Sequence, residues 1–488
     1  MTLSEDLAHW AAQLELEAVP DRVRASARSL VLSQLAAARA TLGHDLGRKV
    51  VAAFGPPLQE DPKRSAYVLA ALTIALDYDD TEFAGHTTHS AVNVSLAYAR
   101  SLRLGGRAAL TAAISAIECA ARLTAAATLG PLRGQAATHA HLVGALSARL
   151  HSERAPSDHW VAALGIALTA PPRPVMRGFL ATDAKILAAA TPLRAGLDAC
   201  DAASAGLKGA ADIIEHPEGF LAEYAAVPLP QTITAGLGER WHTETASLKV
   251  YPGSAYISSA IECAVELYDA LGGTDPDDIA EVVVAASLFT TEIDHRLASY
   301  LDLDEPSPIV LGFSVAYNVA TALLTGTLGP QDLSPELVRD AARWRLAAKV
   351  SVVHDGELTQ RALAATAPIG EALRQAGLTA RPWLEQQGGA AAGALAGQMG
   401  PPSRTFETAD KAIGARVTLR LVDGRELSAS RSSAAGAAGA GTREGQFALM
   451  REKFVGTGGS HEVVDAVARI EDLDAAALDE LLSAALGG

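Results

Sequence analysis

The sequence LDYDDTEFAGHTTHS, residues 76–90, interrupts a chain that is otherwise rich in Ala and Leu at helical spacing. It places four carboxylates within six positions and follows them with two histidines. So dense a polar cluster is compatible with a metal site, an acid/base site or a solvated turn. Its titratable residues are Asp77, Asp79, Asp80, Glu82, His86 and His89.

Local spacing gives these side chains different orientations. Asp77, Asp80 and Thr81 stand at i, i+3 and i+4, so they share one helical face if the preceding helix continues that far, whereas Asp79 points elsewhere. A glycine then breaks the helix, which places His89 near the N-terminus of the next one. The helix dipole there disfavours imidazolium and keeps the ring neutral. A neutral imidazole beside carboxylates is suited to moving a proton.

A magnesium site is the second interpretation. Asp79 and Asp80 resemble the start of the aspartate-rich magnesium motif of terpenoid enzymes. That chemistry needs a second acidic motif, and the following segment does not supply one in VNVSLAYAR, residues 92–100. Only 5% of the residues are aromatic, which fits poorly with the stabilisation of carbocations. A magnesium-dependent terpenoid enzyme is therefore a remote alternative, and we expect no metal.

Composition narrows the classes of partner and the location. The formal net charge of −16 argues against nucleic acid or an anionic membrane surface as a partner. Three widely separated cysteines, Cys119, Cys200 and Cys263, fit a reducing compartment. The N-terminus carries acids early, and no stretch reaches the roughly 18–20 uncharged apolar residues of a membrane span. We therefore expect a cytoplasmic protein.

The order of predicted elements indicates a large helical domain interrupted by a smaller mixed one. Helical patterns fill the first half of the chain. Strand patterns occur at 279–287, 346–355 and 415–430, the last a hairpin, and a Gly/Ala-rich stretch at 386–404 indicates a surface loop. We predict a mainly α protein with a helical domain over 1–255, an inserted α+β lid domain over 256–432 and a C-terminal return to the helical domain over 433–488.

The chain resembles the MmgE/PrpD family along nearly its whole length. The segment ALDYDDTEFAGHTTHSAVNVSLA, residues 75–97, resembles the LDxDDT…H signature of that family. Members of the family include 2-methylcitrate dehydratase, cis-aconitate decarboxylase and iminodisuccinate epimerase. Further similar segments follow in the family's order: LAHWAAQLELEAVPDRVRASARSLVL, TDAKILAAATPLRAGLDACDAASAGLKGAADIIEHPEGFL, LKVYPGSAYISSAIECAVEL, GFSVAYNVATALLTG, VTLRLVDGREL and REKF.

This resemblance implies a fold and a chemistry. The fold is an all-helical domain with an inserted α+β lid, usually assembled as a homodimer, and the active site lies between the two domains. The chemistry involves a proton on the carbon next to a carboxylate, then loss of water, loss of CO2 or reprotonation, with no metal or organic cofactor. We therefore expect a cofactor-free lyase, with an isomerase or epimerase as the other outcome, acting on a small carboxylic acid.

The resemblance also implies the roles of individual residues in the signature. Asp77 and Thr81 match its first Asp and its Thr. His89 matches its His, and His86 is the alternative because the spacing from Thr81 differs here. We expect His89 to be the acid/base, Asp77 to be its partner and Thr81 to donate a hydrogen bond to the substrate.

Outside the signature, the resemblance implies two lysines and a tyrosine. Lys185 in TDAK matches the family's central Lys, whose ammonium group would hold a substrate carboxylate. Lys249 matches the Lys before YP, and Tyr317 matches the Tyr after FS. The expected catalytic residues are thus His89, Asp77, Lys185 and Tyr317, and the expected substrate-binding residues are Thr81, Lys249, His86 and Ser258.

Several positions depart from the family pattern. The family commonly continues YP with a basic residue and a His, and these positions are Ala255 and Ser258 here. A second family His is replaced by Gln135 and Ala136. Because the missing groups would hold a multiply charged acid, we expect a smaller or less charged substrate, or an altered reaction. A non-catalytic relative that keeps the fold is the alternative from another class.

Overall fold

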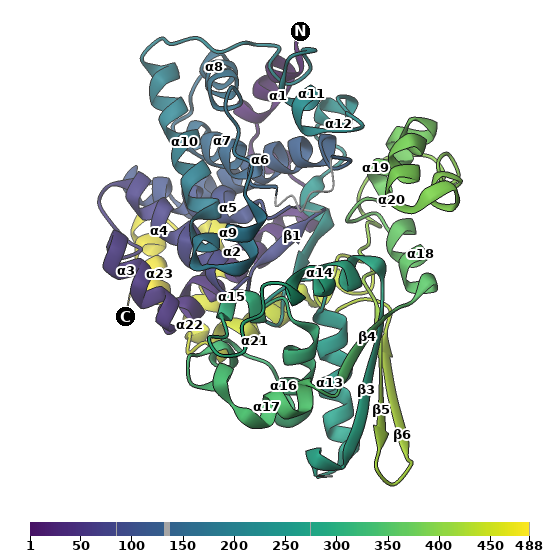
Figure 1. Cartoon of the computed structure of the whole chain (residues 1–488). Coiled ribbons are helices and arrows are strands. Elements are labelled where there is room, and N and C mark those ends of the chain that lie inside the picture. Colours follow the sequence, from purple (N-terminus) through teal and green to yellow (C-terminus); the bar gives the residue numbers. More distant parts are fainter. Residues whose placement is uncertain (84, 131–136, 274, 488) are drawn as a thin grey trace.

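Helices dominate the computed structural model, which describes residues 1–83, 85–130, 137–273 and 275–487, and the predicted mainly α fold is confirmed (Figure 1). Gln135 and Ala136 lie outside the described residues. The first half of the chain contains α1 (Leu3–Ala12), α2 (Asp21–Leu42), α3 (Asp45–Phe54), α4 (Pro62–Ala75), α5 (Thr88–Ser101), α6 (Gly106–Ala126), α7 (Ala140–Ser152), α8 (Ser157–Ala167), α9 (Met176–Ala181), α10 (Leu187–Ser204), α11 (Phe220–Tyr224) and α12 (Gln231–Thr234).

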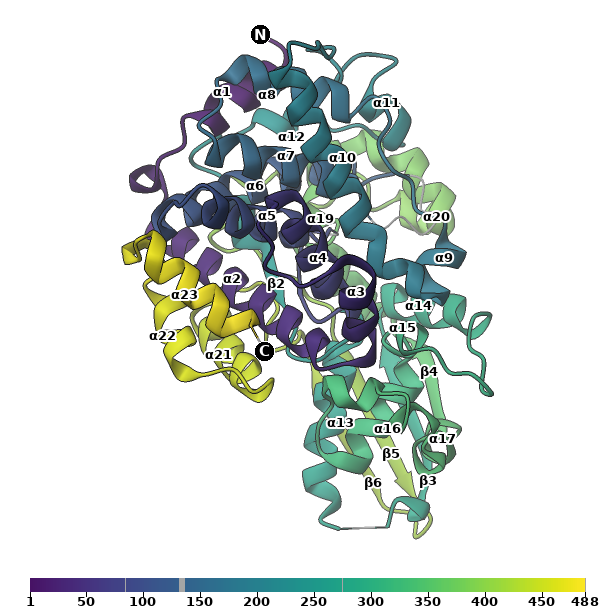
Figure 2. The ribbon, with the colours of Figure 1, turned by 90° about the vertical axis from the view of Figure 1, so that its left-hand side faces the viewer.

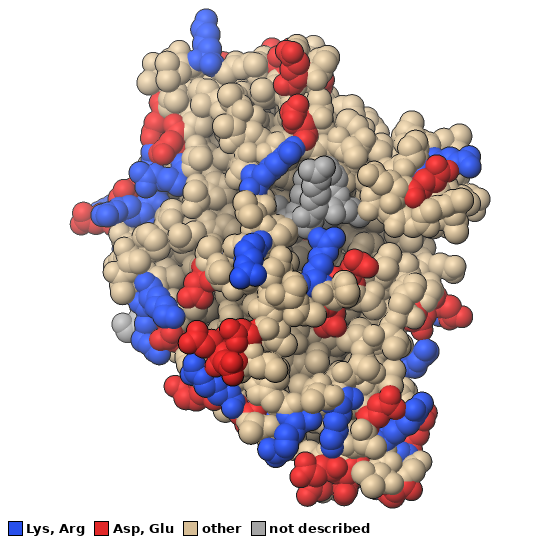
Figure 3. All heavy atoms as spheres, in the orientation of Figure 1, with Lys and Arg blue, Asp and Glu red and all other residues tan. Residues whose placement is uncertain are grey.

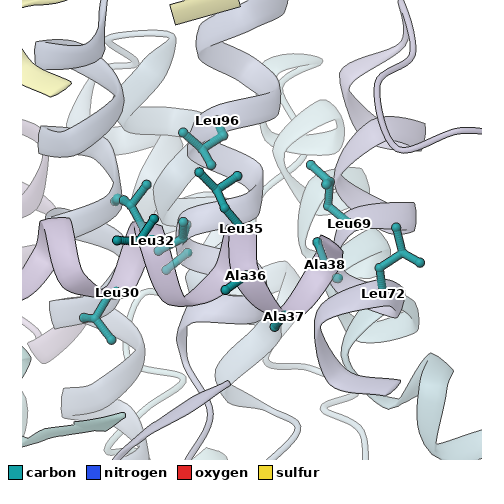
Figure 4. Close-up of a cluster of buried hydrophobic side chains, with 14 of the residues drawn as sticks. Leu30, Leu32, Leu35, Ala36, Ala37, Ala38, Leu69, Leu72 and Leu96 are labelled. Atoms are coloured by element: carbon teal, nitrogen blue, oxygen red, sulfur yellow. The ribbon is translucent and has the colours of Figure 1, made fainter. Parts of the chain in front are cut away.

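Small side chains allow these helices to pack closely. A Cβ atom on Gly144 of α7 would lie 2.3 Å from the Oγ of Ser90 in α5, and one on Gly196 of α10 would lie 2.5 Å from the carbonyl oxygen of Leu142 in α7. Close contact of this kind explains the high alanine content. Figure 4 shows the same principle in the core, where leucines of α2, α4 and α5 surround alanines of α2: Leu30, Leu32, Leu35, Ala36, Ala37, Ala38, Leu69, Leu72 and Leu96.

Helix α6 is the one described helix long and apolar enough to cross a membrane by composition alone. Its apolar window is 94% buried inside the protein, between α5 and α7. The charged residue Glu118 on this helix is also buried, and it accepts hydrogen bonds from the backbone nitrogen and the hydroxyl of Thr243, both at 2.8 Å. A core helix accounts for this composition. The cytoplasmic location stays a prediction.

The α+β region places helices on one face of a four-stranded sheet with the order β4-β3-β5-β6 (Figure 1). β3 and β4 are parallel, the other neighbours are antiparallel, and α13 and α16 share an apolar core with the sheet. The strands lie where the sequence predicts them. The elements are α13 (Ser258–Leu271), β3 (Ile279–Ala286), α14 (Leu288–Ala298), α15 (Pro308–Leu311), α16 (Val315–Thr325), α17 (Ala341–Ala347), β4 (Val350–His354), α18 (Gly356–Ala364), α19 (Gly370–Ala376), α20 (Arg381–Gly393), β5 (Ala415–Leu421) and β6 (Glu426–Arg431).

The loop predicted over 386–404 is wrong in its first part. Helix α20 continues through the Gly/Ala-rich sequence to Gly393, with a kink at Gly388 and Gly389, where the backbone leaves the helical region. The two glycines interrupt the helix there, and Gly389 takes a left-handed φ of 70°.

The C-terminal helices pack against α2 near the start of the chain. Figure 2 shows α21 (Gln446–Gly456), α22 (His461–Ala468) and α23 (Ala475–Leu486) beside α2. Met450 and Phe454 of α21 are fully buried in the same core as the leucines of α2. The ends of the chain therefore build one hydrophobic core. The domain boundaries at residues 255 and 432 stay a prediction.

The acid-rich segment does not continue α4, so the helical face expected for Asp77, Asp80 and Thr81 is wrong. Helix α4 ends at Ala75, and Asp77 takes a left-handed φ of 52° that turns the chain away. An aspartate tolerates this conformation better than most residues. Residues Asp80–Glu82 then form the strand β1, which pairs antiparallel with β2 (Ala246–Leu248). The cluster thus lies on a buried two-stranded ladder between distant parts of the chain.

Figure 3 shows the distribution of charged side chains on one face of the molecule. On the face shown in Figure 3, acidic and basic side chains are interspersed rather than gathered into a continuous basic patch. The same face is hollowed between the helical domain and the segment that contains α19 and α20 (Figures 1 and 3).

Candidate active site

Asp77 lies between two lysine side chains that come from distant segments. Its Oδ1 is 3.0 Å from the Nζ of Lys185 and 3.2 Å from the Nζ of Lys249. Lys185 belongs to the 3₁₀ turn η2 (Asp183–Ile186), and Lys249 directly follows β2. All three side chains are buried. Burial by itself would raise the pKa of Asp77, but Lys185 and Lys249 hold it below its usual value.

Asp79 is the centre of the cluster, although the sequence suggested that it points elsewhere or is solvated. It is fully buried. Its Oδ1 accepts a hydrogen bond of 2.8 Å from Lys249. Its Oδ2 lies 2.5 Å from the Nδ1 of His86 and 3.0 Å from the Nε2 of His89. Burial favours the protonated form, but His86, Lys249 and His89 hold the pKa of Asp79 well below its usual value.

The two histidines of the cluster differ in what they can reach. Their rings are stacked at 5.6 Å with an interplanar angle of 10°. His89 is fully buried, and its Nδ1 is 2.8 Å from the hydroxyl of Thr73. Its Nε2 faces Asp79 but forms no well-directed hydrogen bond with any described residue. His86 uses Nδ1 for Asp79 and keeps 26% of its side chain exposed, so its second nitrogen is the more accessible one.

Asp80 and Glu82 are buried and bind residues at the start of α5. Asp80 accepts hydrogen bonds from Gln34, at 3.0 Å, and from the hydroxyl of Thr88. Glu82 accepts from the backbone nitrogen of Thr87 at 3.2 Å and from its hydroxyl at 2.8 Å. Both carboxylates are fully buried. Burial, together with neighbouring carboxylates, raises their pKa values. They secure the start of α5 behind the cluster.

Thr81 contacts Lys411, a residue of the site that the sequence did not reveal. Its hydroxyl accepts a hydrogen bond of 2.7 Å from Lys411, which is buried ahead of β5. Burial, with help from nearby Lys249, lowers the pKa of Lys411 to about 7. Nothing in the surrounding sequence ADKAIGARV distinguishes this lysine from an ordinary surface residue. Only the pairing of segments more than 300 positions apart reveals it.

Ser258 also reaches the edge of the site. It is the first residue of α13 and lines a small cavity of about 20 Å³ together with Lys249 and Lys411. Ala255 lines the same cavity. Two of the positions where the sequence departs from the family pattern, Ala255 and Ser258, are therefore next to the site.

Tyr317 is the expected catalytic residue that the structure places elsewhere. Its hydroxyl donates to the carbonyl oxygen of Asp332 at 2.8 Å, and Arg343 donates to it at 3.2 Å. Arg343 in turn binds the carboxylate of Asp332 at 2.7 Å. The tyrosine is fully buried in this network. The hydroxyl is therefore already satisfied by groups of the α+β region, and the catalytic role of Tyr317 stays a prediction.

The cluster also contains a set of potential metal ligands. One atom each from Asp79, His86 and His89 lies within 4.8 Å of the others. An Asp/His₂ set suits several divalent metals. However, Lys249 already pairs with Asp79 and a second ammonium group, that of Lys185, is bound to the adjacent Asp77. Two buried positive charges oppose the entry of a divalent cation, which favours acid/base chemistry over metal binding.

The fold and the cluster together define a mainly α protein with a buried acid/base site of carboxylate, imidazole and ammonium groups. The chain belongs to the MmgE/PrpD family: the model of the family's N-terminal domain matches residues 5–231, and the model of its C-terminal domain matches residues 251–408. No curated protein matches the sequence. Membership of this family is consistent with lyase- or dehydratase-type chemistry.

Proposed function

We propose that the protein is a cofactor-free lyase or isomerase that moves a proton at the carbon next to a carboxylate or carbonyl group of a small organic acid. The observation that carries the proposal is Asp79, a buried carboxylate contacted by His86, His89 and Lys249. A carboxylate that orients an imidazole and stabilises its charged form is the arrangement that general acid/base catalysis requires.

His86 is the acid/base in this proposal, in place of the expected His89. Its Nδ1 is held by Asp79 at 2.5 Å, and part of its ring is exposed. His89 is fully buried and bound to Thr73, so it supports Asp79 rather than meeting the substrate. In the reaction, the free nitrogen of His86 takes the proton from the substrate carbon, and Asp79 stabilises the imidazolium that results.

Lys185 and Asp77 form the carboxylate-binding part of the site. A substrate carboxylate competes with Asp77 for Lys185, whose Nζ also lies 5.3 Å from the ring of Phe313. The ammonium group then stabilises the enolate charge that develops as the proton leaves. The enolate can expel a β-hydroxyl group, which takes the proton from the His86 imidazolium and leaves as water. Alternatively, it can regain a proton from solvent on its other face. In a decarboxylation, His86 starts as the imidazolium, CO2 leaves, and the resulting carbanion takes the proton from His86.

Exchange with solvent deuterium tests the proposal. The purified protein is incubated in D2O with a panel of small mono- and dicarboxylic acids, and proton NMR follows the loss of the signal at the carbon next to the carboxylate. We expect exchange or product formation with at least one acid, and a decrease of about 10²- to 10⁴-fold in His86→Gln. His461→Gln is the matched control, since His461 is exposed at the start of α22.

The outcomes separate the candidate functions. Absence of exchange and of product with every acid, from a folded protein, would overturn the proposal in favour of a non-catalytic relative. An activity that is lost with EDTA and restored by a divalent metal would instead assign Asp79, His86 and His89 as metal ligands. We expect EDTA to have no effect.

A homodimer is part of the same proposal, because the family resemblance implies it. Light scattering coupled to size-exclusion chromatography measures the mass directly. A monomer of 50.3 kDa would contradict the expected assembly without affecting the proposed chemistry.

A further inference from the structure

Lys411 is a buried cation without an anionic partner. Its side chain is 4% exposed, and its Nζ donates to the hydroxyl of Thr81 at 2.7 Å. It forms no ion pair with any residue in the described part of the chain, whereas Lys185 and Lys249 both bind Asp77. A buried ammonium group costs free energy unless an opposite charge is close enough to compensate it.

The acidic residues nearest to Lys411 are already engaged. Asp79 binds Lys249 and His86. Glu82 accepts both of its hydrogen bonds from Thr87, and burial raises its pKa well above the usual value, which favours its neutral form. Both carboxylates act to raise the pKa of Lys411, but neither forms an ion pair with it in the described part of the chain.

The space in front of Lys411 offers further groups that suit an anion. The cavity of about 20 Å³ is lined by Lys411, Lys249 and Ser258. Ser258 is the first residue of α13, a helix of 14 residues, so the positive end of the helix dipole adds to the two ammonium groups. The small side chain of Ala255 completes the opening. Lys411, from a distant segment, thus supplies a basic group near position 255, where the family resemblance implies one.

We propose that Lys411, Lys249 and Ser258 form a second carboxylate subsite, so that the substrate is a dicarboxylic acid. This inference rests on the proposed function, in which the first carboxylate binds Lys185. A volume of about 20 Å³ accommodates little more than one water molecule. Binding of the second carboxylate therefore requires this cavity to widen.

Binding of unreactive acids tests the subsite without requiring turnover. Isothermal titration calorimetry compares each dicarboxylate with a monocarboxylate of equal chain length: malonate with propionate, succinate with butyrate, and glutarate with valerate. We expect at least one dicarboxylate to bind about 10- to 100-fold more tightly than its counterpart. In Lys411→Met this preference is lost, while the affinity for the monocarboxylate stays within about twofold of the wild-type value. Equal binding within every wild-type pair, or a preference that survives in Lys411→Met, would overturn the inference.

Lys453→Met is the matched control. Lys453 is also buried, its pKa is also lowered to about 7 by burial, and it donates to the carbonyl oxygen of Tyr78 at 2.5 Å, but it does not line the cavity. This variant keeps the preference for the dicarboxylate. Loss of the preference in both variants would contradict a specific role of Lys411.

The pH dependence of the wild-type protein gives a second measurement that needs no variant. Lys411 faces Lys249, Glu82 and Asp79, together with the ring of Tyr256 at 5.5 Å. With a pKa of about 7 in the free protein, it is charged below that pH and neutral above it. The dicarboxylate preference therefore declines between pH 7 and 9. A preference that is constant over this range contradicts the inference.

The two proposals fail in different ways. Deuterium exchange that persists while the dicarboxylate preference is absent leaves the reaction standing and removes the subsite. A preference that depends on Lys411, without exchange into any acid, leaves the subsite standing and removes the reaction.

Discussion

Two buried networks of charged and polar groups in this protein differ in how completely they are satisfied. In the α+β region, Asp332, Arg343 and Tyr317 form a closed set: Arg343 binds the Asp332 carboxylate at 2.7 Å, and the backbone nitrogen of Gly329 donates to its other oxygen at 2.7 Å. In the candidate active site, the Nε2 of His89 and the Oε1 of Glu82 have no hydrogen-bond partner in the described residues, and Lys411 has no counter-charge.

This contrast indicates which network serves stability and which serves chemistry. A closed network has no unpaired hydrogen-bonding group for a ligand. The network of Asp332, Arg343 and Tyr317 joins α16 to α17. A network with unpaired groups costs folding free energy, which proteins tolerate where a substrate later completes the set. Variants in the first network should therefore affect stability alone, whereas substitution of Asp79 in the second should affect activity more than stability.

The largest effect is expected for Asp79→Asn. The neutral amide cannot stabilise an imidazolium on His86, so deuterium exchange should fall by about 10³-fold or more. Lys249 keeps Asp77 as a partner at 3.2 Å, and the protein should stay folded. Exchange rates and circular dichroism measure the two effects. Asp198→Asn, at an exposed surface salt bridge, is the control and should behave as the wild type. A folded Asp79→Asn variant with near-normal exchange would refute the central role of this carboxylate.

Arg343→Met tests the closed network. Removal of one partner from a buried ion pair leaves Asp332 uncompensated and should cost about 3–5 kcal/mol of stability. Urea denaturation followed by fluorescence measures the loss. The exchange rate of the remaining folded protein should be unchanged. If activity fell while the urea midpoint stayed constant, the assignment of this network to stability would be wrong.

Tyr317→Phe separates the two networks at a single hydroxyl group. The family resemblance implies a catalytic tyrosine, whereas the structure commits its hydroxyl to Asp332 and Arg343. We expect a loss of about 1–2 kcal/mol of stability and less than a threefold change in exchange rate. A decrease of about 100-fold in exchange would instead restore the catalytic assignment, since general acid/base groups contribute at least that much.

The architecture could be predicted from sequence because helices, strands and turns each leave a local pattern of residues, such as the alternation of apolar side chains in a strand. The strands at 279–287 and 415–430 show β-branched alternation and a turn at Asp423–Gly424, and they are found as β3 and the β5–β6 hairpin. The C-terminal helices pack against α2. Local spacing does not predict the end of α4 at Ala75, because the turn at Asp77 accompanies the pairing of β1 with β2. That pairing joins residues more than 160 positions apart, which no local pattern reports.

The site was predicted in part for the same reason. Asp77, Lys185 and Lys249, which the family resemblance assigns to the site, lie together, but Asp77 pairs with the two lysines rather than with His89. The sequence assigned no role to Asp79 or Lys411, and the role of Tyr317 stays a prediction. Helical spacing directed Asp79 away from Asp77, but in the actual backbone both bind Lys249. Lys411 carries no motif of its own. Which charged residues are buried together is a property of the tertiary fold, and single-sequence patterns do not encode it.

The smallest effect is expected for Glu82→Gln. The pH dependence of its stability tests whether the Glu82 carboxylate belongs to the incompletely satisfied network. Burial and Asp80 raise the pKa of Glu82 well above its ordinary value of 4.5, so the wild-type protein loses stability as the pH rises from 4.5 toward the raised value. The variant lacks this loss and should be about 1–2 kcal/mol more stable at pH 7 and equal near pH 4. Urea midpoints at both pH values measure this difference in stability.

Glu118→Gln is the control with the opposite sign. The pKa of Glu118 is lowered to about 2, so its carboxylate stabilises the protein above pH 4.5. That contribution is lost as the pH falls toward 2. If Glu82→Gln destabilised the protein at pH 7 as Glu118→Gln should, the carboxylate of Glu82 would belong to a satisfied network, and the division between the two kinds of network would not hold at this residue.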